Sequence, residues 1–465
     1  MEYRTATDLA ADLRARRMSA EELLDQTIET IEAMDGAINA VVVRDFDRAR
    51  EAARAADAGL AAGDPRPLLG VPMTVKEAFN VAGLPTTWGL PGTEAIPIYE
   101  DAVIVGRLKA AGAIIVGKTN IPALLADWQS ANPVYGVTRN PWDLSRTPGG
   151  SSGGGAAALA AGFVPLEYGS DMASSLRAPA HFCGIYAHKP THGLTPSRGF
   201  APPGAPAACP APEIDLAVVG PMARSAEDLD LALQITAGPD AHQATAYRLQ
   251  LPPPRHAALK EYRVLVLDQH PLVPTSDSIR AAIAERATRL EALGCRIGRS
   301  SPHLPDLVQT ADTFVELLMA QLSADEPDTD AADGEGSPSH RDWIAADRLR
   351  TAFAQQWREL FRDWDVVLCP SMPTQAPRLN GASSPDAIEA EGVFVPYQAQ
   401  PLWGTLATLT GNPATAFPAG LDAMGLPIGL QAVGPYLEDR TTIGFAGLMA
   451  REFGGFVVPP FPWRG

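Results

Sequence analysis

Residues 1–62 carry the apolar spacing of helices. Ser19 and Glu22 form the pattern of a capping box before one such run, and Thr7 is suited to cap the run before it. A third helix is predicted over 45–60. The chain is therefore expected to begin with a helical segment.

From residue 63 onward, short apolar runs alternate with helical patterns, and glycine and proline separate them. Alternating strands and helices predict a layered α/β fold. Strands are expected at 68–75, 113–117, 262–267, 295–298 and 366–368, and helices at 102–111 and 276–293.

The α/β pattern resumes at residue 366 after a helical stretch, which favours one large domain with an insertion over two separate domains. We divide the chain into 1–62, a central part 63–240, an α/β unit with a helical insertion over 241–365, and a last part 366–465. Within the insertion, 323–339 holds six acidic residues and no basic one, and it is expected to be a solvated surface loop.

Composition narrows the function. The chain has 465 residues, 46% of them hydrophobic. Its formal charge of -17 disfavours partners such as nucleic acids, whose binding depends on neutralising phosphates. No apolar run approaches the roughly 20 residues of a membrane helix, and the N-terminus has no apolar stretch typical of a secretory signal. A cytoplasmic protein is expected, with four scattered cysteines as reduced thiols.

Three segments combine reactive side chains with backbone freedom: Lys76 in GVPMTVKEAFNVAG, Ser151 and Ser152 in TPGGSSGGGAAALAAG, and Ser174 and Ser175 in GSDMASSLRAPA. A lysine acts as a base at neutral pH only where burial or a nearby cation lowers its pKa. Each segment also has a purely structural interpretation, respectively a solvated strand end, a crowded helix N-terminus and a plain turn.

Other motifs are weaker. The glycine-rich loop matches GxSxG around either serine, but the polar, proline-containing stretch 140–148 before it is unlike the buried strand of a nucleophile elbow. It also lacks the pattern of a phosphate-binding P-loop. The cluster of His181, Cys183, His188 and His192 fits no common zinc spacing, so no metal site is expected.

Together the three segments resemble the amidase signature family of serine hydrolases. The resemblance covers well over half of the chain and excludes about 250–365. It rests on the three segments and on DAVIVGRLKAAGAIIVGKTN, YGVTRNPWDLSRTPGGSSGG, GSDMASSLRAPAHFCGIYAHKPTHG, VVGPMARSAEDLDLAL and TLTGNPATAFPAGLDAMGLPIGLQAVGP. It implies an α/β/α sandwich on a mixed central β-sheet, with 63–240 as the catalytic core and 366–465 as the C-terminal part of that core.

The resemblance also implies a Ser-cisSer-Lys triad, with Lys76 as the base, Ser151 as the bridging serine after a cis peptide bond, and Ser175, 24 positions later, as the nucleophile. A serine hydroxyl attacks an amide only with a base in reach, and a neutral Lys76 can draw a proton from Ser175 through Ser151.

Further site residues follow from the same resemblance. It places the oxyanion hole at the backbone N–H groups of Met172, Ala173, Ser174 and Ser175. Asp171 and Arg177 are expected to support this loop, with Arg177 pairing with Asp171 or with a substrate carboxylate. The chain departs from the family in having Ala173-Ser174 where Gly-Gly is usual, so a positive φ at either position would carry strain.

We therefore predict an amidohydrolase that cleaves a linear carboxamide, an aryl amide or a carbamate without metal or organic cofactor, as a monomer or homodimer with no membrane partner. Apolar pocket walls are expected from Trp88, Met172, 91–99 and 200–212.

Three alternatives stay open. The first is the glutamine-hydrolysing A subunit of a tRNA-dependent amidotransferase. The second is a Ser-His-Asp esterase that uses Ser152 with His270 or His303. The third is a non-catalytic binder whose oxyanion hole is spoiled by Ala173-Ser174.

Overall fold

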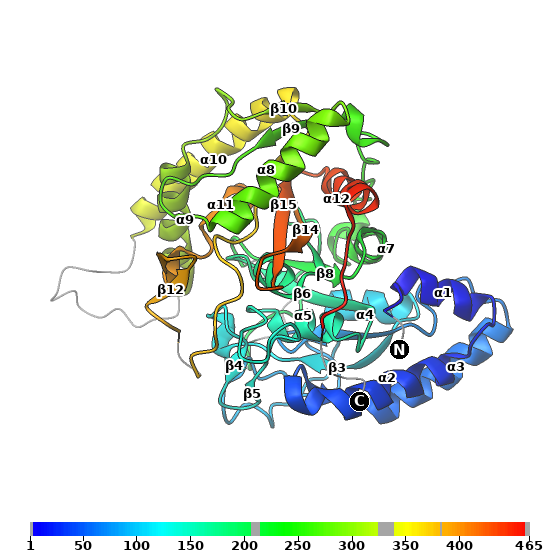
Figure 1. Cartoon of the computed structure of the whole chain (residues 1–465). Helices are drawn as coiled ribbons and strands as arrows, with labels where there is room; N and C mark the ends of the chain where they lie inside the picture. The colour runs from blue at the N-terminus through cyan, green and yellow to red at the C-terminus, as the bar shows by residue number, and fades with distance from the viewer. Residues whose placement is uncertain (1–2, 206–213, 324–338, 382–383, 461–465) are drawn as a thin grey trace.

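The computed structural model describes residues 3–205, 214–323, 339–381 and 384–460 (Figure 1). The N-terminal segment forms three helices, α1 (Ala6–Arg14), α2 (Ala20–Ile38) and α3 (Phe46–Ala61). The capping box of Ser19 and Glu22 is confirmed. The prediction for Thr7 is wrong, because Thr5 caps α1, while the Thr7 hydroxyl lies inside the helix and donates to Asp228 at 2.6 Å.

A mixed sheet of eleven strands runs through the molecule in the order β1-β3-β2-β6-β8-β7-β14-β15-β11-β9-β10. The pairs β3/β2, β2/β6, β11/β9 and β9/β10 are parallel, and the other neighbours are antiparallel. This confirms a mixed α/β fold of one domain. The strands are β1 (Val41–Arg44), β2 (Pro72–Lys76), β3 (Ile114–Thr119), β6 (Leu166–Asp171), β7 (Tyr186–Lys189), β8 (Val218–Ala223), β9 (Arg263–Val266), β10 (Arg296–Gly298), β11 (Val366–Pro370), β14 (Ala414–Leu421) and β15 (Pro427–Val433).

Helices cover both faces of this sheet, as neighbouring residues of β6 show. The Tyr168 hydroxyl lies 2.8 Å from Thr236 of α7 (Ala226–Thr236). A Cβ built on Gly169 would lie 2.7 Å from Ser152, which precedes α5 (Gly153–Ala160). Because neighbouring strand residues point to opposite faces, α5 and α7 lie on opposite sides. The other main helices are α4 (Val103–Ala110), α6 (Arg177–Cys183), α8 (Asp277–Ala292), α11 (Leu402–Thr408) and α12 (Asp439–Phe453).

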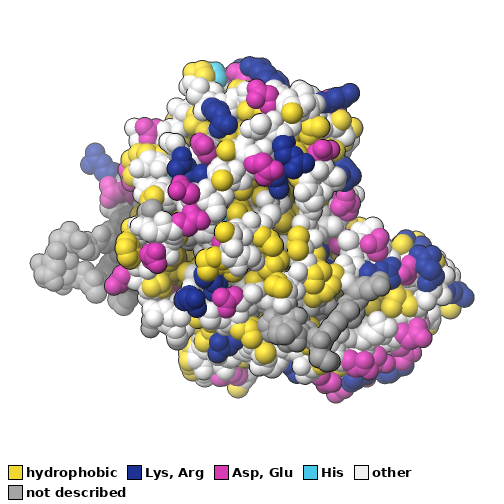
Figure 2. Space-filling view, in the orientation of Figure 1, with side chains coloured by type: hydrophobic (Ala, Val, Ile, Leu, Met, Phe, Trp, Pro, Cys, Tyr) yellow, Lys and Arg dark blue, Asp and Glu magenta, His cyan; other side chains and the backbone are white. Residues whose placement is uncertain are grey.

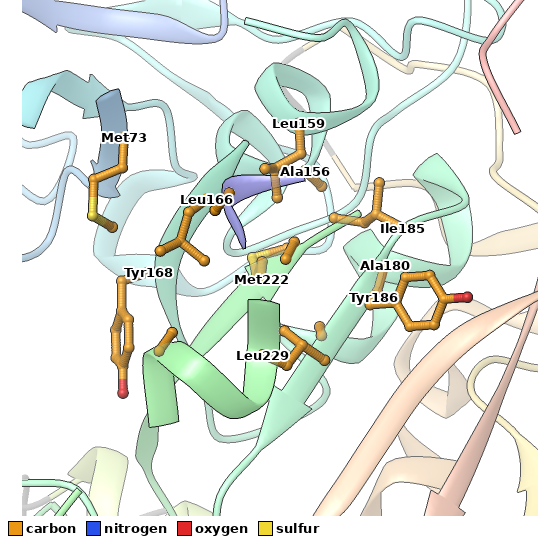
Figure 3. Packing of buried hydrophobic residues seen from close by; sticks show 14 of the residues in the cluster. Met73, Ala156, Leu159, Leu166, Tyr168, Ala180, Ile185, Tyr186, Met222 and Leu229 are labelled. Atoms are coloured by element: carbon orange, nitrogen blue, oxygen red, sulfur yellow. The ribbon is translucent and has the colours of Figure 1, made fainter. Parts of the chain in front are cut away.

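The main core lies between the sheet and these helices. Figure 3 shows Leu166 and Met222 of neighbouring strands packed among side chains of the surrounding helices. Such a continuous apolar cluster holds the elements that carry the site in a fixed arrangement.

The region 241–365 extends the same sheet. It supplies β9 and β10 at one edge, and α9 (Leu307–Leu322) packs against α10 (His340–Asp363) and α11. The predicted acidic loop lies largely outside the described residues. Two short strand pairs stand apart from the sheet, namely β4 (Ala131–Asn132) with β5 (Gly136–Val137), and β12 (Ala387–Ala390) with β13 (Val393–Pro396).

The surface and the thiols add two observations. Figure 2 shows acidic and basic side chains interspersed on the face it presents. Among the described residues, no helix has both the length and the apolar character needed to cross a membrane. Three cysteines, Cys183, Cys295 and Cys369, are buried free thiols, and Cys209 lies outside the described residues.

Candidate active site

Lys76 ends β2 at the carboxyl edge of three adjacent parallel strands, β3, β2 and β6. Its side chain is fully buried, and its Nζ donates to the hydroxyls of Ser151 at 2.6 Å, Ser152 at 3.0 Å and Ser170 at 2.9 Å. Burial lowers the pKa of Lys76 from about 10.5 to about 7, although nearby carboxylates favour the charged form. The amine is therefore surrounded by hydroxyls and can be neutral near pH 7.

The loop 149–155 brings Ser151 to this lysine. The Gly150–Ser151 peptide bond is cis, as the resemblance implied. A Cβ at Gly150 would lie 2.3 Å from the Asp127 carbonyl oxygen, and one at Gly154 would lie 2.3 Å from the Asn120 nitrogen. The backbone packs so closely here that only glycine fits, and α5 begins directly after the serines.

A second loop carries Ser175 from the end of β6 to the start of α6. The Asp171 carboxylate accepts from the N–H groups of Ser174 at 3.0 Å and Leu176 at 3.1 Å, and pairs with Arg177 at 2.9 Å. Burial opposes ionisation of Asp171, but the charge and hydrogen bonds of Arg177 outweigh it and hold its pKa below the ordinary value. The expected pairing of Asp171 with Arg177 is thus present.

The two serine loops meet through the backbone. The Ser152 N–H donates to the Ser175 carbonyl oxygen at 3.1 Å, and Ser175 is 7% exposed. No hydrogen bond joins the hydroxyls of Ser151 and Ser175 among the described residues. Catalytic hydrogen bonds are often long in a free enzyme and tighten once substrate is bound.

The predicted oxyanion donors differ in their availability. The Ser174 N–H is already used by Asp171, so it is committed to holding the loop. Within the described part of the chain, the N–H groups of Met172, Ala173 and Ser175 have no hydrogen-bond partner. Three of the four predicted donors are therefore not used by other groups of the described chain, and their role as an oxyanion hole stays a prediction.

Ser174 shows what the departure from Gly-Gly does to the loop. Its φ is 73°, a left-handed conformation that favours glycine. Its hydroxyl is buried and has no hydrogen-bond partner among the described residues. It lies against Gly404, because a Cβ built on Gly404 would lie 1.9 Å from the Ser174 Oγ. Ala173 does not have a positive φ within the described chain.

Sequence reasoning missed two residues beside these loops. The Trp128 indole N–H donates to the Ala173 carbonyl oxygen at 2.9 Å, and its ring packs against Tyr397 at 5.4 Å. Glu167 of β6 is fully buried and attracts the charge of Lys76. The available signals were an acid inside an otherwise apolar stretch and a tryptophan shortly after β3.

Of the residues predicted to form the pocket walls, Met172 lies in the loop that carries Ser175, whereas Trp88 is buried in the main core. Met172 and Ala173 pack against an apolar cluster that includes Leu216, Phe314 and Leu409. Trp88 lies in the main core, with its ring 5.3 Å from Phe200 and its indole N–H donating to Ala78. Part of 200–212 falls outside the described residues, so that wall stays a prediction, as does Trp88.

The other candidate clusters are engaged elsewhere. The ring nitrogens of His181 lie within hydrogen-bond distance of the Gly429 and Thr374 oxygens, and those of His188 of Thr415 and Asp439. Within the described ranges, no group of three or more metal-binding side chains gathers. The Ser152 hydroxyl accepts from Lys76 and donates to the Ser170 carbonyl oxygen. In the part described, no histidine is hydrogen-bonded to it.

Comparison with known proteins agrees with this geometry. A family model described as Amidase matches residues 22–332 and 316–443. The chain is 32% identical to the A subunit of the glutamyl-tRNA(Gln) amidotransferase of Anaeromyxobacter sp. (strain K), over 98% of this chain and 97% of that protein. It is 34% identical to "Putative amidase AmiB2" of Mycobacterium tuberculosis (strain ATCC 25618 / H37Rv), over 92% of each.

Among solved structures, that of a bacterial aryl acylamidase of the amidase signature enzymes family superposes with a TM-score of 0.81. It has 25% identity and covers 97% of this chain and 96% of that one.

Proposed function

The chain belongs to the amidase family, and from this premise we propose that it hydrolyses the C–N bond of a linear carboxamide or carbamate. The acyl-enzyme forms on Ser175, with Ser151 as the proton relay and Lys76 as the base. The observation that carries the proposal is the buried Lys76 amine, 2.6 Å from the Ser151 hydroxyl in the loop that meets Ser175.

Catalysis begins with neutral Lys76, which takes a proton from Ser151 as Ser151 takes one from Ser175. The Ser175 oxygen attacks the carbonyl carbon, and the backbone N–H groups of Met172, Ala173 and Ser175 receive the oxyanion. The relay then runs backwards and protonates the leaving amine, and the C–N bond breaks. Water attacks the acyl-enzyme by the same relay, which releases the acid and frees Ser175.

The surroundings of the loop favour an apolar, uncharged substrate. The Arg177 guanidinium is fully engaged, because it bonds Asp171, the Gly404 oxygen, Gln431 and Thr408. It therefore has no free donor for a substrate carboxylate. Met172 borders the apolar cluster to which α9 contributes Phe314 and α10 contributes Phe353. An aryl amide or aryl carbamate matches such walls, and the aryl acylamidase named above supports this choice.

Hydrolysis of glutamine is the second candidate, because the chain also resembles an amidotransferase A subunit. Glutamine carries an α-carboxylate that a site would pair with a cation. Arg350 is a second possible cation, because it lines a cavity of about 200 Å³ together with Leu409. Its guanidinium is already paired with Asp215 at 2.7 Å and with Asp347 at 2.5 Å. These pairings disfavour glutamine.

The test is amine or ammonia release from aliphatic amides, acyl anilides, aryl carbamates and L-glutamine. Wild type is compared with Lys76→Ala, Ser151→Ala and Ser175→Ala. We expect release from anilides or aryl carbamates, with a loss of at least about a thousandfold in each variant. Activity that survives Ser175→Ala would refute the nucleophile, and release from glutamine alone would favour the second candidate.

A further inference from the structure

Glu167 is a buried carboxyl that the proposed mechanism does not use. It lies in β6 with no exposed surface, and its Oε1 accepts from the Thr119 hydroxyl at 2.8 Å. Its Oε2 accepts from the hydroxyl of Thr74, its register partner in β2. Within the described chain, no lysine, arginine or histidine forms an ion pair with it. Two neutral hydroxyls are therefore its direct partners.

The fold provides space for this side chain. A Cβ on Gly155 of α5 would lie 2.6 Å from the Glu167 Cγ and 2.8 Å from its Oε1. The helix thus presents bare backbone where the carboxyl group lies, and a larger residue at Gly155 would collide with it. An ionised carboxyl group buried without a directly paired cation is costly, so its position calls for a functional explanation.

We propose that Glu167 is a positioning residue for Lys76, whose carboxylate stabilises the ammonium that Lys76 becomes when it accepts the serine proton. This inference rests on the proposed function. Thr74 and Lys76 are two residues apart on β2 and so point to the same face, which directs both Glu167 and the Lys76 amine toward one layer.

The charged groups around Lys76 single out Glu167. Asp171 also attracts Lys76, but its charge is matched by Arg177 at 2.9 Å, and Lys189 lies near that pair. Glu167 has no guanidinium beside it, so Lys76 is the charged group that favours its ionised form. Burial raises the pKa of Glu167 to about 8, and the two threonine hydroxyls and the charge of Lys76 oppose this rise. The carboxylate is therefore favoured when Lys76 holds a proton, which is the state that the proposal concerns. Two such neighbours titrate as a pair in two steps near neutral pH.

Removing the carboxylate has two linked consequences. In Glu167→Gln the Lys76 ammonium loses its counter-charge, so Lys76 becomes neutral at lower pH, by about one pH unit. The same loss makes Lys76 a weaker base, so the rate on the alkaline plateau falls several-fold, by about 3 to 10 times. A purely structural role for Glu167 would lower the rate without moving the pH profile.

The experiment measures the rate at which a fluorophosphonate labels Ser175 between pH 5 and 10, because this rate depends on the protonation state of Lys76. Mass spectrometry locates the label. We expect the acidic limb of the pH profile of the labelling rate to shift to lower pH by about one unit in Glu167→Gln. Thr119→Val removes one hydroxyl donor and keeps the charge, so the carboxylate is less stable and a smaller shift in the same direction is expected. Asp228→Asn, at a buried carboxyl that caps α1 through Ala6, should not shift the limb.

A limb that stays within 0.2 unit of wild type in both Glu167→Gln and Thr119→Val overturns the inference. If Glu167→Gln does not fold, Thr119→Val alone decides. Lys76→Ala and Ser175→Ala separate this outcome from failure of the proposed function. Normal labelling of the Lys76→Ala variant would reject the triad, whereas lost labelling with an unshifted Glu167→Gln limb would reject only the role of Glu167.

Discussion

Residues 172–176 connect β6 to α6 and carry the predicted nucleophile Ser175, and we call this segment the nucleophile loop. The side chain of Ser174 is expected to make this loop less stable than glycine would. It holds a φ of 73°, and its hydroxyl is buried against Gly404 without a described partner. We predict that Ser174→Gly raises the free energy of unfolding, although it removes a buried side chain next to the predicted nucleophile. The Ser174 N–H already donates to Asp171, and this bond is kept in the variant.

The magnitude follows from four contributions. Release from the left-handed conformation contributes about 1–2 kcal/mol, and loss of the unpaired hydroxyl about 1 kcal/mol. The added freedom of glycine in the unfolded chain opposes this by about 0.7 kcal/mol, and the lost buried methylene by about 0.8 kcal/mol. The net gain is about 1 kcal/mol. In a chain of 465 residues this raises the Tm by roughly 1 °C.

Urea denaturation and calorimetry of wild type, Ser174→Gly and Ser174→Ala measure the effect. Ser174→Ala keeps the Cβ and the φ and removes only the hydroxyl, so it should gain about 1 kcal/mol. The rate of fluorophosphonate labelling should stay within about twofold, because the loop geometry is preserved. If Ser174→Ala instead loses more than about 1 kcal/mol, the hydroxyl is stabilising and the reasoning fails.

Three further predictions address the surroundings of the site. Trp128→Phe keeps the ring and removes the donor to the Ala173 oxygen, so kcat should fall about five- to tenfold with KM little changed, as measured by steady-state kinetics. Lys76→Met should stabilise the fold at pH 6 and less so toward pH 10 in urea titrations. The unfolded chain keeps the Lys76 proton to about pH 10.5 while the folded chain releases it near 7, so the cost of burying this lysine fades as pH rises. Gly155→Ala should lower the Tm by forcing a Cβ onto the Glu167 side chain, and Gly155→Ala combined with Glu167→Ala should recover part of the loss; no recovery would argue against that contact.

The sequence predicted those elements whose signals are local. The capping box at Ser19 needs only two nearby side chains, and the helix expected over 45–60 differs from α3 by one residue at each end. The order of the sheet could not be predicted. Placing β15 between β14 and β11 depends on contacts between distant segments, which periodicity does not encode.

The candidate site divides in the same way. Lys76, Ser151 and Ser175 were identified because each lies in a segment with a family resemblance, while Glu167 was not predicted from the sequence. The role that we propose for Glu167 depends on strand register, because β6 places Glu167 opposite Thr74, and Thr74 lies two residues before Lys76 in β2. The role of Trp128 likewise needs the loop after β3 to lie against the nucleophile loop, which only the folded chain shows.

The arrangement of the strands explains why we expect Trp128 and Glu167 to act differently. The parallel strands β3, β2 and β6 end at one edge of the sheet, so Lys76 and the loop after Asp171 meet there although they are far apart in sequence. Trp128 touches the nucleophile loop directly, so its loss should alter kcat through geometry. Glu167 lies four residues before the end of β6, beneath that edge, and reaches the reaction only through charge. A shifted pH profile should therefore follow from changes at Glu167 and be absent in Trp128→Phe, and the same shift in both variants would refute this division of roles.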